Sequence, residues 1–92
     1  MKFTVRILSG KRAGLESELL PATVHAASHP YFLEDEALEF RLELKAPVDD
    51  LYLCLHENEV GVTQSFQEGE IWVYLWKPKR LYKNGYECFF HN

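Results

Sequence analysis

Apolar and polar residues alternate along three stretches of the chain. Every second residue is apolar over residues 3–7, over residues 38–44 and over residues 51–56. A period of two is typical of a β-strand with one buried face, because successive side chains point to opposite sides of a sheet. The alternation therefore predicts a half-buried strand in each of these stretches.

Turn-forming residues join these strands. Residues 9–14 contain two glycines and lead to a second short strand over residues 15–20, which Pro21 ends, so the pattern predicts a first hairpin. Residues 46–50, with the sequence Ala-Pro-Val-Asp-Asp, have the composition of a turn. We therefore predict a second hairpin, between the strand at 38–44 and the strand that follows it.

Shorter signals continue the pattern towards the C-terminus. Residues 57–59 predict a chain reversal into a weak strand over residues 60–63. The Asn-Gly pair at 84–85 is a strong signal for a type I′ turn, and it predicts a hairpin between residues 80–83 and 86–90.

Two segments in the first half are less regular. Residues 22–27 leave two alternatives open, because alanine favours a helical turn whereas Thr23 and Val24 favour a strand. The acidic run Glu34, Asp35 and Glu36 predicts an exposed loop before the strand at 38–44.

The run over residues 71–76 is apolar on both faces, which predicts a central strand or one beneath an overlying segment, and Pro78 ends it. Short strands at regular spacing, seven to ten in all, are typical of an all-β antiparallel sandwich. Within that fold we expect Leu42, Leu53 and Val73 to lie in the core.

Composition agrees with one small domain over residues 1–92. Apolar residues make up 47% of the chain and charged residues 26%, which is typical of globular proteins. No apolar stretch is long enough for a spanning helix, and the first residues lack the features of a secretory signal. The two cysteines, Cys54 and Cys88, are too few for a disulfide framework, so a reducing compartment is expected.

Charge is unevenly distributed along the chain. The net charge of −4 divides into +4 over residues 1–15, −11 over residues 16–70 and +3 over residues 71–92. One interpretation is ordinary solvated charge on unrelated strands. The other is an acidic body with a basic trailing segment that faces an anionic partner. The second interpretation makes two groups candidate interaction surfaces: the cations Lys77, Lys79, Arg80 and Lys83, and the acids Glu34, Asp35 and Glu36.

Residues 5–10 and 14–16 resemble the opening of forkhead-associated domains, in which a first strand and a glycine-containing turn lead to a second strand. Residues 66–73 resemble the segment before the last strand of those domains. More narrowly, the chain is similar to the cytoplasmic domain of the inner-membrane ring protein of type III secretion systems, the PrgH and MxiG group. The segments that carry this similarity are residues 40–44, 51–57 and 69–75.

The sequence departs from the phosphothreonine site of forkhead-associated domains. Those domains bind the phosphate through an arginine after the third strand, a serine and a histidine in the next loop, and an asparagine before a late strand. Here residues 24–28 contain no arginine, residues 34–36 are acidic, and the Asn-Gly pair at 84–85 follows the last matched strand. The resemblance therefore implies a degenerate scaffold that does not recognise phosphothreonine.

Catalytic and metal-binding chemistry is a minor candidate. His25 and His29 have the i, i+4 spacing of two metal ligands on a helix, but Pro30 follows at once and no third ligand lies in register. Cys54 and His56 share a strand face without a residue that would orient them, and a thiol on an apolar strand is usually inert. We expect no catalytic residue, metal or cofactor.

Aromatic and basic residues adjoin at the end of the central strand, where Trp72, Tyr74 and Trp76 share one face and the cations follow. This combination suits single-stranded nucleic acid, but the alternative is a core stripe followed by a solvated tail, and the acidic majority of the chain makes nucleic acid a minor candidate. A juxtamembrane role explains the same cations better, because basic residues just cytoplasmic of a spanning helix are attracted to anionic lipid. We therefore expect no nucleic acid and no small-molecule substrate.

The resemblance implies a non-enzymatic module at the cytoplasmic face of the bacterial inner membrane, as the N-terminal part of a longer secretion-ring subunit. Its partners would be neighbouring copies of itself in the ring, cytoplasmic secretion components and, near the basic segment, the anionic inner leaflet. The first alternative is a freestanding binding domain that recognises a phosphorylated or acidic partner. A small enzyme that uses Cys54 and His56 is the second.

Overall fold

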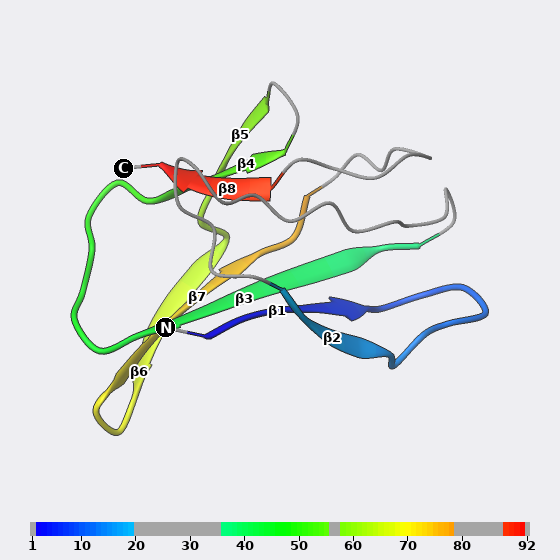
Figure 1. The fold of residues 1–92 in the computed structure, drawn as a ribbon, viewed down its shortest axis with the longest axis horizontal. Coiled ribbons are helices and arrows are strands. Elements are labelled where there is room, and N and C mark those ends of the chain that lie inside the picture. The colour runs from blue at the N-terminus through cyan, green and yellow to red at the C-terminus, as the bar shows by residue number, and fades with distance from the viewer. Residues whose placement is uncertain (1, 20–35, 56–57, 79–87, 92) are drawn as a thin grey trace.

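The computed structural model describes residues 2–19, 36–55, 58–78 and 88–91 of the chain (Figure 1). The described residues form eight β-strands and no helix, which confirms the all-β class. The strands are β1 (Lys2–Ile7), β2 (Glu16–Leu19), β3 (Leu38–Leu44), β4 (Tyr52–Leu55), β5 (Asn58–Gly61), β6 (Gln64–Glu68), β7 (Ile71–Trp76) and β8 (Cys88–His91).

Five strands form one antiparallel sheet in the order β2-β1-β3-β7-β6. The predicted first hairpin is confirmed, since β1 pairs with β2 and Phe3 lies opposite Leu19. A second hairpin joins β6 to β7 through a two-residue loop. Its first residue, Gly69, has φ of 60°, and a turn with positive φ only at that position matches the right-handed twist of the strands it joins.

The predicted hairpin between residues 38–44 and 51–56 is wrong. Strand β3 lies between β1 and β7, so both of its edges are already paired. The chain instead crosses to a three-stranded sheet of order β5-β4-β8. The connection is held against the first sheet by a hydrogen bond of 2.8 Å, which the Val48 amide donates to the Tyr74 hydroxyl. Residues 46–50 therefore form a crossover and not a tight turn.

The second half of the chain differs from its predicted pattern around β5 and β6. The weak strand expected at 60–63 corresponds to β5, which begins two residues earlier and ends at Gly61, whereas β6 occupies residues 64–68, where no strand was predicted. The segment at 22–27 and the 84–85 turn lie outside the described residues. Of the predicted final hairpin, the structure describes β8, which pairs with β4.

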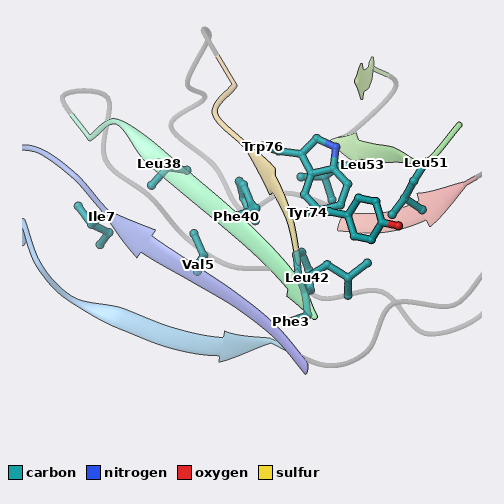
Figure 2. Packing of buried hydrophobic residues seen from close by; sticks show 10 residues of the cluster. All are labelled: Phe3, Val5, Ile7, Leu38, Phe40, Leu42, Leu51, Leu53, Tyr74 and Trp76. Carbon is teal, nitrogen blue, oxygen red and sulfur yellow. The ribbon is translucent and has the colours of Figure 1, made fainter. Parts of the chain in front are cut away.

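The hydrophobic core joins residues from both sheets (Figure 2). Tyr74 and Trp76 of β7 stack with their ring centroids 6.4 Å apart, and Leu51 and Leu53 lie beside them. The other core residues come from β1 and β3: Phe3, Val5, Ile7, Leu38, Phe40 and Leu42. The prediction that Leu42, Leu53 and Val73 are buried is confirmed.

The expected burial of β7 on both faces is also confirmed. Val73 and Leu75 are buried on the face opposite Tyr74 and Trp76. In the register of the sheet, Val73 lies midway between Arg41 and Glu68, whose side chains form an ion pair of 3.0 Å. This pair crosses β7 above Val73 and shields it, because the long arginine stem covers apolar surface while its charge stays in solvent.

Replacing Leu53 with Ala should destabilise the domain by roughly 2–5 kcal/mol, because it leaves a cavity where the two sheets share their core. Leu15→Ala is the matched control, since that leucine is 55% exposed and its truncation should change stability by less than about 0.5 kcal/mol. Urea unfolding of both variants measures the difference. Equal effects at the two sites would show that Leu53 does not join the sheets.

Candidate functional site

Glu36, which the sequence placed in an exposed acidic loop, is fully buried. The Arg12 guanidinium donates two hydrogen bonds to its carboxylate, from Nε to Oε2 at 2.7 Å and from Nη2 to Oε1 at 2.5 Å. The exposed-loop prediction is therefore wrong for Glu36. A buried carboxylate is stable only when it is paired, and Arg12 provides that pairing. Glu34 and Asp35 lie outside the described residues.

The Arg12–Glu36 pair anchors the loop between β1 and β2 to the residues before β3. Two further hydrogen bonds act beside it: the Leu8 amide donates to the Ala37 carbonyl at 2.7 Å, and the Ala37 amide donates to Ser9 Oγ at 2.9 Å. We call these contacts the Arg12–Glu36 lock, because they hold the two segments together. The burial of Glu36 is explained by this lock, so it requires no binding partner from outside the domain.

One cation from each basic end of the chain, Arg6 and Lys77, pairs with an acid of the segment 16–70. Lys77, the one described member of the predicted basic surface, is exposed and forms an ion pair of 3.4 Å with Glu39 on the outer face of the five-stranded sheet. Near the other end, Arg6 pairs with Glu16 at 3.3 Å. The charges that are separated along the sequence are therefore interleaved across the sheet at these positions. Lys79, Arg80 and Lys83 lie outside the described residues.

Arg12→Ala should destabilise the domain by about 3 kcal/mol or more, because it leaves the buried Glu36 carboxylate without its cation. The matched control is Arg6→Ala. Its ion pair is about half exposed at both ends, so its loss should cost less than about 1 kcal/mol. Thermal and urea unfolding compare the two variants. If the two losses were equal, Glu36 would not depend on Arg12.

The crossover between the sheets borders a pocket of about 320 Å³. The lining comes from three parts of the chain: the crossover, the start of β4 with the end of β5, and the paired strands β6 and β7. Its polar members are Asp49, Asp50, Tyr52, Ser65 and Tyr74. A volume at the small end of the usual range for ligand pockets, roughly 300–1,000 Å³, suits one long side chain better than a cofactor.

The pocket is acidic. Within the described part of the chain neither Asp49 nor Asp50 forms an ion pair, and its described lining contains no lysine or arginine. Asp50 has φ of 53°, a left-handed conformation that only glycine, asparagine and aspartate adopt readily. This conformation therefore suits an aspartate at position 50. Two carboxylates in the lining favour a cationic partner.

The pocket adjoins an open sheet edge. Strand β6 is the last strand of the five-stranded sheet, and within the described residues it pairs only with β7. Ser65 of β6 lies directly opposite Tyr74, so both side chains point to the face that carries the core and the pocket. The edge and the pocket are therefore parts of one surface.

The sequence interpretation missed this site. Asp49 and Asp50 were predicted to lie in a hairpin turn, and β6 was not predicted. One usable signal was Tyr74: a tyrosine in the middle of a buried strand needs a hydrogen-bond partner for its hydroxyl, and the crossover provides it at Val48.

The other candidate chemistry falls largely outside the described residues. This is the case for His25, His29 and His56, and for the side chain of Cys54. Among the described residues, no group of three or more histidine, cysteine, aspartate or glutamate side chains has the arrangement of a metal site. In the same part of the chain, no helix is long and apolar enough to cross a membrane.

No protein-family model, no curated protein and no solved structure matches the chain. The all-β fold, the Arg12–Glu36 lock and the pocket beside β6 are accordingly the features from which a function is argued.

Proposed function

We propose that the domain is a non-enzymatic protein-interaction module that acts through the surface formed by β6 and the adjoining pocket. The observation that carries this proposal is the juxtaposition of an exposed edge strand with a pocket that contains two carboxylates; within the described residues the strand pairs only with β7 and neither carboxylate forms an ion pair. Unpaired backbone groups on a sheet edge are a ready template for another chain. An adjacent pocket supplies specificity for one of its side chains.

The proposal includes a β-sandwich architecture. It is supported by Leu51 and Leu53, which bring the three-stranded sheet into the core of the five-stranded sheet. The order β1-β3-β7-β6 facing β5-β4-β8 also corresponds to the A-B-E-D and C′-C-F orders of immunoglobulin-type sandwiches, with β2 added at one edge. Domains of this architecture commonly present interaction surfaces on their edges and loops.

The narrower role, a subunit of a type III secretion ring that docks neighbouring copies or cytoplasmic components, rests on the resemblance of residues 40–44, 51–57 and 69–75 and stays a prediction. So does the degenerate forkhead-associated relation. The intramolecular pairing of Arg6, Arg12 and Lys77 favours a local docking site over a contact driven by the basic ends.

The module is tested by photo-crosslinking in the cells that produce it. A photoreactive amino acid replaces Gln67 on β6 or, as the matched control, Ser17 on β2; both residues are exposed and both lie on edge strands of the same sheet. We expect a discrete crosslinked protein from position 67 and none from position 17. Absence of any product at 67, or identical products at both positions, would overturn the proposal.

A further inference from the structure

We propose that the partner binds as an extended segment that adds to β6 as a further strand and places a lysine or arginine side chain in the pocket beside it. This inference rests on the proposed function and adds to it the conformation and the chemistry of the partner.

Strand β6 has the properties of an edge that accepts another strand. Its sequence, Gln-Ser-Phe-Gln-Glu, contains no proline and no lysine, and its pairing with β7 is continuous from Gln64 to Glu68 without a bulge. Proline, lysine and bulges are the usual devices by which edge strands prevent such pairing. Four of its five side chains are exposed, and Phe66 on the outer face is half-buried.

The opposite edge of the sheet is less suitable. Strand β2 is shorter, and of its two outward-facing acids only Glu16 is paired, with Arg6, whereas Glu18 forms no ion pair within the described residues. The outer face of β6 carries Gln64, the apolar Phe66 and Glu68, which is paired with Arg41. A partner strand with apolar or neutral residues on its outer face therefore meets less unpaired charge at β6.

The register of the sheet determines which side chain reaches the pocket. Residues directly opposite each other in a sheet point to the same face. Because Ser65 and Tyr74 are opposite each other and both line the pocket, the partner residue beside Ser65 also points to the pocket side. Its neighbours in the added strand point to the outer face, beside Phe66.

The chemistry of the pocket selects a cation for that position. Asp49 and Asp50 provide carboxylates without an ion pair in the described part of the chain. A lysine or arginine side chain satisfies them through charge-assisted hydrogen bonds. A glutamate at the same position would be repelled. Backbone pairing thus gives affinity for an extended chain, and the pocket gives selectivity for its sequence.

The binding mode is tested with four seven-residue peptides. The first has Thr at odd positions, Val at positions 2 and 6, and Lys at position 4; the second has Glu at position 4 instead. The third and fourth repeat the lysine sequence with N-methyl groups on alternate amides, along one edge in the third and along the other edge in the fourth. We expect the lysine peptide to bind at least about tenfold more tightly than the glutamate peptide, because only it forms charge-assisted bonds.

Backbone pairing makes a separate prediction. N-methylation along one edge of the peptide should abolish binding, whereas methylation along the other edge should leave it nearly unchanged, because an added strand hydrogen-bonds through one edge only. Amide exchange measured by NMR should slow for residues 64–68 when the lysine peptide is added, and should stay unchanged for residues 16–19.

The pocket is tested with Asp49→Asn combined with Asp50→Asn. Asparagine tolerates the left-handed conformation of residue 50, so the backbone is retained while both charges are removed. This variant should lose the preference for lysine over glutamate. The matched control, Glu16→Gln with Glu18→Gln, removes two charges from the distant strand β2 and should keep the preference.

Equal affinity for the lysine and glutamate peptides, equal effects of N-methylation on the two edges, or protection confined to residues outside β6 would each overturn the inference. If these results accompanied a discrete crosslink from position 67, the interaction module would stand and only this binding mode would fail. Loss of the crosslink as well would overturn both.

Discussion

The structure depends on the packing of Leu51 and Leu53 against the aromatic stripe of β7. Strands of four residues, such as those of the three-stranded sheet, are too short to be stable unless they pack on another layer. Tyr74 and Trp76 provide that layer, and large aromatic side chains bury much apolar surface from few residues. The same contact brings the crossover into place, since Tyr74 also accepts the hydrogen bond from Val48.

Ion pairs within the domain change how the uneven distribution of charge along the sequence is interpreted. Along the sequence, the basic ends and the acidic body look like two complementary surfaces. In the folded chain, Arg6 and Lys77 face acids across neighbouring strands, and Arg12 neutralises a buried one. Exposed pairs of this kind contribute little to stability. They do, however, neutralise Glu16 and Glu39, whereas Asp49 and Asp50 at the pocket form no ion pair within the described part of the chain.

The sequence predicted individual strands better than their partners. The alternation at 3–7 and 38–44 and the run at 71–76 that is apolar on both faces correspond to β1, β3 and β7, because a buried strand face consists of apolar residues. The residues of one strand do not show in the same way which strands pair with it. The turn-like composition of residues 46–50 fits a crossover as well as a hairpin, and the exposed pattern of β6 gives no apolar period to detect. Glu36 was misplaced for a related reason: its burial depends on Arg12, which lies 24 residues away.

The candidate site arises where the sequence prediction failed, and the two facts have one cause. A tight hairpin at 46–50 would have placed β4 beside β3 and left Asp49 and Asp50 at a solvated tip. The crossover instead carries these residues over the end of the five-stranded sheet, where they meet Ser65 and Tyr74. At residues 46–50 the local sequence favours a tight turn, whereas the fold uses the same residues for a long connection. Such disagreements between local preference and overall fold concentrate at functional sites. The position of the pocket is therefore set by topology, whereas its acidity is set by the two residues that made the segment resemble a turn.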